Sequence, residues 1–138
     1  MISVVWWSAT GNTEDMALAV ARGIEAAGKD VLIKNVNDIS VEQALTCDAI
    51  AFGCPAMGDE VLEEMDFEPF FADIEGSLEG KRIVLFGSYA WGTGAWMEDW
   101  IERANNAGAI VVASIIACGS PDEATIAELE EAGKTLAE

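Results

Sequence analysis

Small and hydroxyl-bearing residues near the N-terminus have the composition of an anion-binding loop: Ser8, Ala9, Thr10, Gly11, Asn12 and Thr13. The loop follows an apolar run at 2–7 and precedes a helical pattern at 15–27. In that position the backbone N–H groups at the start of the helix point toward a bound anion, and the helix dipole favours negative charge. Hydroxyl and amide side chains add further donors. We therefore predict that residues 8–13 bind a phosphate.

This loop lacks the features of the two common nucleotide-binding motifs. No Lys or Arg precedes Arg22, so a phosphate would be held by hydrogen bonds rather than by cations. A triphosphate loop requires Gly-Lys-Ser/Thr and the dinucleotide fingerprint requires three glycines, whereas the loop contains only Gly11. ATP, GTP and NAD are therefore poor fits. The alternative interpretation is that the loop only caps a helix, because Ser, Thr and Asn are ordinary capping residues.

Two later loops carry large apolar side chains that suit a flat aromatic ligand. One places Met57 beside the acidic pair Asp59-Glu60, and the other places Tyr89 and Trp91 among small residues. A ring gripped between such side chains, with a phosphate on the first loop, describes a mononucleotide with a planar head group. The alternative is that Met57 and Trp91 only cover the edge of the fold.

The elements that must position these loops are five short apolar runs, which alternate with helical patterns: 2–7, 31–36, 49–54, 83–87 and 110–117. Several runs are apolar throughout, which is typical of parallel strands buried on both faces. The sequence predicts one α/β domain over residues 1–138, a doubly wound five-stranded parallel sheet with helices on both faces. Ligands bind such sheets beyond the carboxyl ends of the strands. The three loops described above lie there, as does the segment 118–121.

The chain is strongly acidic, with 25 acidic and 7 basic residues and a net charge of −18. Nucleic acid and anionic membranes are therefore disfavoured as partners, since both attract Lys and Arg. Nine acidic residues and no basic one lie between Asp59 and Glu79. A field of this sign would attract a basic docking surface and, through like-charge repulsion, favours a monomer. Solubility is the alternative reason for such a surface.

Histidine is absent, which excludes Ser-His-Asp triads and most metal sites, so we expect no metal. Cys47, Cys54 and Cys118 form no Cys-x-x-Cys pair, and we expect all three to be buried, reduced thiols. No segment has the length and apolarity of a membrane span, and no basic region precedes an apolar one at the N-terminus. A cytoplasmic location is expected.

Three motifs resemble those of a known family. Residues 7–14, Trp-Ser-Ala-Thr-Gly-Asn-Thr-Glu, are similar to the FMN-phosphate loop of flavodoxins. Residues 53–60, Gly-Cys-Pro-Ala-Met-Gly-Asp-Glu, and 86–92, Phe-Gly-Ser-Tyr-Ala-Trp-Gly, resemble the loops that flank the isoalloxazine ring in short-chain flavodoxins. The resemblance covers essentially the whole chain. It implies the flavodoxin-like fold with strand order 2-1-3-4-5, noncovalent FMN, and low-potential one-electron transfer in place of ferredoxin, mainly between the neutral semiquinone and the hydroquinone.

The resemblance also implies roles for individual residues. Residues 8–13 would bind the phosphate, with Ala9 contributing its backbone N–H. The Ser88 hydroxyl would lie near the phosphate and contribute a further contact. Trp91 would stack on the outer face of the flavin and Met57 would cover its inner face. The backbone of residues 90–92 would serve the pyrimidine end, and Glu60 would accept from the flavin N3–H. The cofactor-binding residues expected in the two ring loops are Pro55, Ala56, Met57, Gly58, Asp59, Glu60, Ser88, Tyr89, Ala90, Trp91 and Gly92.

The Met57–Gly58 peptide would be the redox switch. The flavin N5 becomes an N–H donor when it gains an electron and a proton, so the peptide carbonyl would then turn toward it, and glycine permits the required conformations. Surface carboxylates nearby would oppose the extra charge of an anionic hydroquinone and lower the second potential. Those carboxylates include Asp59, Glu60, Glu63 and Glu64.

Three residues depart from the family pattern. Ala9 and Ala90 stand where these flavodoxins usually have Gly, and a Cβ would cost about 1 kcal/mol if either position requires φ > 0. Pro55 supplies neither a hydroxyl nor an N–H.

A non-enzymatic electron carrier fits the sequence better than the alternative, an FMN-dependent NAD(P)H or quinone reductase on the same fold, because no insertion builds a substrate pocket. A signalling receiver of similar topology would need a phosphorylatable Asp after the third strand, which is missing. The expected partners of the carrier are redox proteins with basic docking surfaces, namely flavodoxin or ferredoxin reductases and iron–sulfur oxidoreductases.

Overall fold

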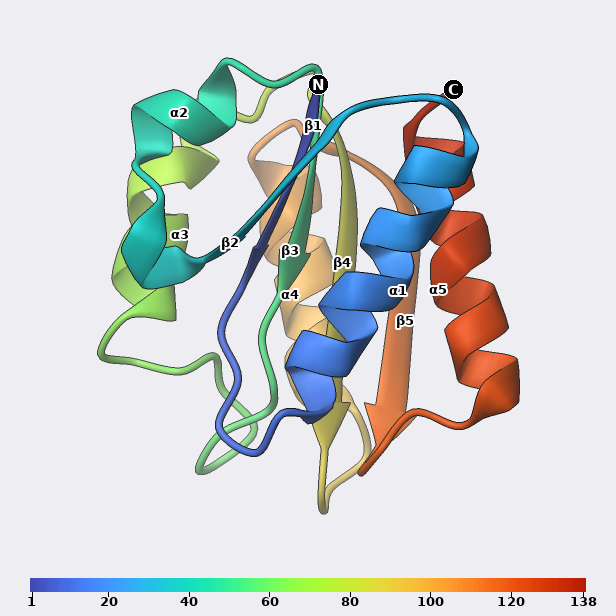
Figure 1. The fold of residues 1–138 in the computed structure, drawn as a ribbon. Coiled ribbons are helices and arrows are strands. Elements are labelled where there is room, and N and C mark those ends of the chain that lie inside the picture. Colours follow the sequence, from blue (N-terminus) through green and yellow to red (C-terminus); the bar gives the residue numbers. More distant parts are fainter.

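The computed structural model describes all 138 residues as one parallel five-stranded sheet between two layers of helices (Figure 1). The strand order is β2-β1-β3-β4-β5, which confirms the predicted topology. The strands are β1 (Ile2–Trp6), β2 (Val31–Asn35), β3 (Ala49–Gly53), β4 (Arg82–Tyr89) and β5 (Ile110–Cys118).

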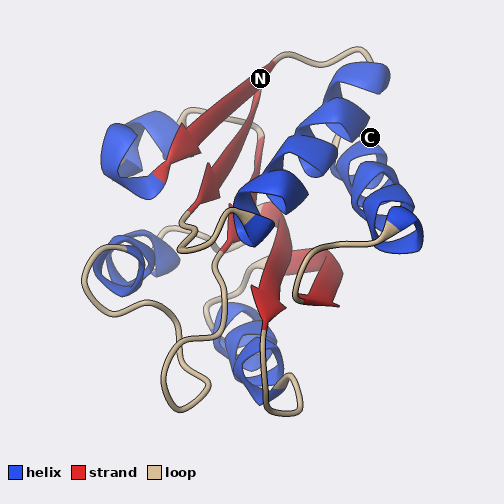
Figure 2. Cartoon of the chain, turned by 60° about the horizontal axis from the view of Figure 1, so that its bottom comes forward, coloured by secondary structure: helices blue, strands red, loops and turns tan.

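Helices cover both faces of the sheet, as Figures 1 and 2 show. Helices α1 (Asn12–Ala26) and α5 (Glu123–Leu136) pack on one face. The other face is covered by α2 (Val41–Leu45), α3 (Phe67–Glu75) and α4 (Ala95–Asn106), and a short 3-10 helix, η1 (Val36–Asp38), precedes α2. None of these helices has the length and apolar character needed to cross a bilayer.

Alternate residues of each central strand enter two separate cores. In β4, Ile83 and Leu85 face the α3–α4 side, whereas Val84 and Phe86 face the α1–α5 side. All four side chains are fully buried. A strand covered on both faces must be apolar at successive positions, because successive side chains point to opposite faces. This burial explains why the apolar runs identified the strands.

Helices α1 and α5 cross at backbone contact. A methyl group added at Gly23 would overlap the carbonyl oxygen of Glu130, and one added at Gly133 would overlap that of Val20. The crossing therefore requires a residue without a Cβ on each helix.

Several boundaries differ from the prediction. Helix α1 begins at Asn12 rather than Asp15, because Gly11 adopts φ +96° and ends the loop there. Cys47 and Cys54 are buried as predicted, but the prediction was wrong for Cys118, which is exposed. Cys118 ends the edge strand β5, where Ser114 and Ile116 are exposed on the same face. An apolar composition does not reveal that the carboxyl end of this edge strand is exposed on one face.

Candidate functional site

The loops that follow β1, β3, β4 and β5 meet at the carboxyl edge of the sheet, at the bottom of Figure 1 and toward the viewer in Figure 2. They enclose a cavity of about 180 Å³ without a charged residue in its wall. The wall consists of Ala9, Thr10, Asn12, Pro55, Ala56, Met57, Ser88, Tyr89, Ala90 and Gly119. All but Gly119 were predicted as site residues. Gly119 lies in the segment 118–121, which was predicted to reach this edge of the sheet, but it has no side chain that could mark it as a site residue.

The phosphate end of this site is rich in unpaired donors. The backbone N–H groups of residues 8–10 and 12–14 donate to no acceptor in the protein, and neither do the side chains of Thr10 and Asn12. Within the loop, only the Gly11 N–H has a partner, the Ser8 hydroxyl at 3.0 Å. No side chain caps the start of α1, so the interpretation that the loop only caps the helix does not account for these donors. An anion fits them.

A buried pair of hydroxyl groups lies next to the cavity. Thr13 Oγ1, on the first turn of α1, is 2.9 Å from Ser88 Oγ, near the end of β4. Either oxygen can donate, and both side chains are buried. The pair fixes the position of the Ser88 hydroxyl, which lines the cavity, relative to the start of α1.

The ring end of the site is open. Met57 and Tyr89 line the cavity, whereas Trp91 lies outside its wall with 62% of its surface exposed. The exposed indole follows Ala90, which lines the cavity, so it lies beside the open end of the site. Trp91 is therefore available to cover a planar group bound at the rim.

A tight turn carries Met57. The Met57 N–H donates to the Val61 carbonyl (2.8 Å), and the Val61 N–H donates to the Met57 carbonyl (3.0 Å), in an isolated antiparallel bridge. Gly58 has φ +51°, and Glu60, at φ +57°, is the one residue other than glycine with positive φ. In this turn the backbone of Glu60 is therefore strained, because a residue with a Cβ rarely adopts positive φ.

The Glu60 side chain connects the two ring loops. Its Oε1 accepts from the N–H groups of Thr93 (2.9 Å) and Gly94 (3.1 Å), whereas its Oε2 accepts from no protein group. Glu60 does not line the cavity. This link was not predictable from the sequence, since the partners are distant along the chain. The free Oε2 leaves an acceptor for the predicted contact with a ring N–H.

Neither Ala9 nor Ala90 adopts positive φ, so the predicted cost of a Cβ at these positions is absent. Pro55 contributes its ring to the wall and, as expected, no donor. The remaining predicted residues lie outside the cavity wall: Ser8, Gly11, Thr13, Gly58, Asp59, Glu60, Trp91 and Gly92.

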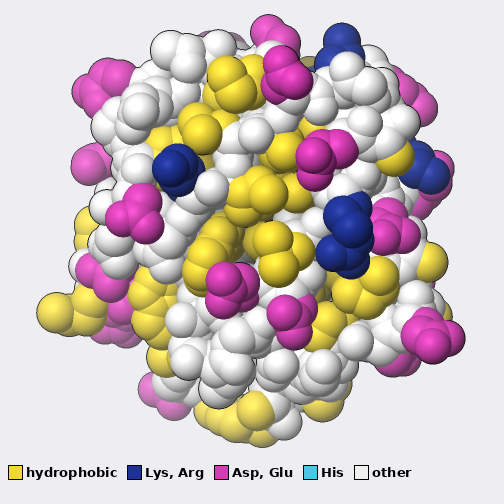
Figure 3. All heavy atoms as spheres, in the orientation of Figure 1, with side chains coloured by type: hydrophobic (Ala, Val, Ile, Leu, Met, Phe, Trp, Pro, Cys, Tyr) yellow, Lys and Arg dark blue, Asp and Glu magenta, His cyan; other side chains and the backbone are white.

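The acidic segment is less uniform than the sequence indicated. Glu68 and Glu75 pair with Arg103 of α4, at 2.7 and 2.8 Å, and hydrogen bonds with Glu68 and then Glu75 raise the pKa of Arg103 above its usual value. The Arg103 guanidinium also lies 5.0 Å from the centre of the Phe71 ring. Figure 3 shows acidic side chains scattered around an apolar patch. Glu63, expected on the surface, is only 6% exposed.

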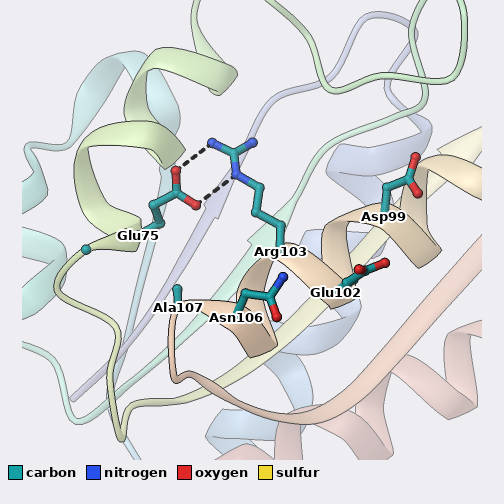
Figure 4. A pocket seen from close by; sticks show the side chains of 7 residues that line it. Glu75, Asp99, Glu102, Arg103, Asn106 and Ala107 are labelled. Carbon is teal, nitrogen blue, oxygen red and sulfur yellow. Dashed lines mark hydrogen bonds and ion pairs between the residues drawn. The ribbon is translucent and has the colours of Figure 1, made fainter.

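A larger depression of about 460 Å³ lies beside Arg103 (Figure 4). Its wall contains Glu75, Asp99 and Glu102, and most of the guanidinium N–H groups already donate to Glu68 and Glu75. With its one cation already paired to two carboxylates and two further acids in the wall, this depression is a poor site for a phosphate. Burial raises the pKa of the Cys54 thiol far above its usual value, so Cys54 stays protonated and is not a nucleophile.

The flavodoxin family model matches residues 4–133 of the chain. The flavodoxin of Clostridium beijerinckii is 48% identical over 137 residues, covering 99% of both chains. The flavodoxin of Megasphaera elsdenii is 44% identical over 137 residues, covering 99% of this chain and 98% of that one. The solution structure of two-electron reduced Megasphaera elsdenii flavodoxin superposes with a TM-score of 0.92 at 44% identity, over 99% of this chain and 98% of that one.

Proposed function

This chain belongs to the flavodoxin family, whose members are FMN-binding electron-transfer flavoproteins and not enzymes. We propose that it is a low-potential one-electron carrier. Its FMN would pass mainly between the neutral semiquinone and hydroquinone states. The observation that supports this proposal most strongly is the cradle of free N–H groups at 8–10 and 12–14, beside an uncharged cavity whose rim carries Trp91. Bound FMN supplies the redox chemistry, and these residues bind and orient it.

We propose that the 57–60 turn supplies the carbonyl that accepts from the protonated flavin N5. The resemblance to flavodoxins implies this role for the Met57–Gly58 peptide. The Met57 carbonyl, however, already accepts from the Val61 N–H, whereas the Gly58 carbonyl accepts no hydrogen bond. A free carbonyl needs no bond broken before it is used. We therefore favour the Gly58 carbonyl as the acceptor, with Met57 held by Val61.

Replacing Gly58 with Thr is expected to raise the free energy of the observed turn conformation by about 1 kcal/mol relative to other conformations of the turn. A β-branched side chain disfavours the observed φ of +51°, and the semiquinone should lose stability with it. The maximum semiquinone fraction in an anaerobic titration measures this effect. Gly80→Thr is the matched control, because Gly80 also has positive φ (+75°) and open space around it, away from the site. Equal semiquinone fractions in parent and G58T proteins would exclude Gly58 from the switch.

FMN is expected to bind faster as the salt concentration rises. The cavity wall holds no cation, and the protein carries a net charge of −18, so added salt screens repulsion of the phosphate dianion rather than an attraction. The association rate constant should increase on the order of tenfold between about 10 mM and about 200 mM salt. Stopped-flow mixing measures it, and riboflavin, which lacks the phosphate, is the control with little change. A rate that falls with salt would mean that cations hold the phosphate.

We propose that redox proteins with basic surfaces dock near the ring end and that the carrier is a monomer. The acidic balance supports both proposals, because opposite charge steers association and like charge opposes self-association. Iron–sulfur oxidoreductases and flavodoxin or ferredoxin reductases are the partner classes of matching chemistry.

Anaerobic stepwise reduction of the purified protein, followed by visible absorbance, tests the proposed function. A yellow protein that passes through a blue neutral semiquinone is the expected result. A yellow protein that is reduced in a single two-electron step would favour a reductase on the same fold. A colourless protein that takes up no added FMN would contradict the proposal.

A further inference from the structure

Glu63 is a buried carboxylate that the proposed chemistry does not use. Its side chain accepts three hydrogen bonds of 2.8 Å, from the N–H groups of Met65, Asp66 and Phe67. The residue is 6% exposed. Burying a carboxylate is costly unless its oxygens are satisfied, and three charge-assisted bonds satisfy them. The acid therefore has a defined structural task.

That task is to cap α3 from outside the helix. Asp66 occupies the N-cap position, but its side chain makes no capping bond. Glu63 supplies the missing acceptor to the N–H groups of Asp66 and Phe67, where the helix dipole also favours negative charge. The backbone carbonyl of Glu63 accepts from the Glu68 N–H at 2.8 Å. Glu63 is thus fixed to the first turn of α3 through both its side chain and its backbone.

The same residue fixes the other end of the ring loop. The Glu63 N–H donates to Cys54 Sγ at 3.4 Å, and the Cys54 thiol donates to the Pro55 carbonyl at 3.5 Å. Cys54 follows β3 directly, so Glu63 closes the loop that begins there. Two residues before Glu63, Val61 forms the bridge with Met57. Between them, Leu62 is buried in the core.

We propose that Glu63 is a positioning residue for the redox switch: by holding the segment 61–63 it keeps the Met57–Val61 bridge closed and confines movement to residues 58–60. The closed bridge supports the turn in which Gly58 adopts positive φ and leaves its carbonyl free. Without the anchor, the bridge opens and this turn loses its support. This proposal rests on the proposed function of the same turn.

The variants Glu63→Gln and Glu64→Gln test the proposal as a matched pair. Both remove one negative charge at neighbouring positions, but Glu64 is exposed and its side chain makes no hydrogen bond in the protein. A glutamine at 63 cannot satisfy all three N–H groups, because one carboxylate oxygen becomes a donor.

The first readout is the equilibrium constant for disproportionation, in which two one-electron-reduced molecules give one oxidised and one two-electron-reduced molecule. We expect E63Q to raise this constant about tenfold and E64Q to change it less than about twofold. Equal changes in the two variants would mean that Glu63 acts by charge alone. An unchanged constant in E63Q with a lower urea midpoint would mean that it only stabilises the fold. Either result overturns the proposal.

The second readout, amide hydrogen exchange, needs no flavin. In the FMN-free parent protein, the Val61 N–H should exchange with solvent within about tenfold of the Phe67 N–H rate, because one anchor holds both. In E63Q, both should exchange faster. A Val61 N–H that exchanges far faster than Phe67 in the parent would overturn the proposal. Since this readout is independent of FMN, a protein that bound no flavin would contradict the proposed function and leave the anchor testable.

Discussion

Replacing Gly23 with Ala is expected to destabilise the folded protein by about 3 kcal/mol. The added methyl would overlap the Glu130 carbonyl of α5, and a helix backbone cannot move aside as a side chain can. The higher helix propensity of alanine would by itself stabilise α1 by about 1 kcal/mol relative to glycine. The expected net loss therefore comes from the separation of the two packed helices. The urea midpoint of the FMN-free protein measures this effect without the contribution of ligand binding.

Gly76→Ala is the matched control for this prediction. Gly76 follows α3 with φ −66°, and a methyl group there meets no atom within 4 Å. We expect this variant to keep the parent stability or to exceed it by about 0.5–1 kcal/mol, because alanine restricts the unfolded chain. If G23A and G76A unfolded at the same urea concentration, α1 and α5 would not cross at backbone contact.

Replacing Trp91 with Ala is expected to weaken FMN binding by about 1–3 kcal/mol, or roughly fivefold to 150-fold in Kd. The indole is largely exposed, so its removal costs little folding free energy, and the loss should appear in ligand affinity alone. Flavin fluorescence, followed as FMN is titrated with the FMN-free protein, measures Kd.

Two variants control for this effect. Trp91→Phe should retain much of the affinity because a flat ring remains. Leu18→Ala, which removes an exposed apolar side chain of α1, should leave Kd unchanged. An unchanged Kd in W91A would remove Trp91 from the site.

The strands were predictable because each leaves a local signal, whereas their order was predicted from the resemblance to flavodoxins. Strands such as β3, buried on both faces, leave uninterrupted apolar runs, and the rule that ligands bind beyond the carboxyl ends of parallel strands then placed the loops. Nine of the ten residues in the cavity wall could be named in advance on this basis, together with the resemblance of the loops to those of flavodoxins.

What could not be predicted were pairings between distant side chains and backbone groups. Nothing local to Arg103 indicates that it neutralises two acids of α3, and nothing local to Glu60 indicates its bonds to Thr93 and Gly94. Backbone angles were equally hidden, since Ala9 was predicted to carry strain only if its φ was positive, and it is not. The sequence identifies which residues gather at the edge of the sheet, whereas the contacts among them depend on the folded geometry.

The crossing of α1 and α5 has a consequence for biosynthesis. Residues 27–122, more than two thirds of the chain, separate these two helices, so a nascent chain on the ribosome carries α1 long before α5 emerges. Until then, apolar residues on that face of the sheet, such as Val84 and Ala51, lack the cover that Leu129 and Ala132 later provide. Incompletely folded domains are prone to aggregate, because their exposed apolar surfaces associate with one another. Chaperones that bind apolar segments should therefore engage this chain until residues 123–136 leave the exit tunnel.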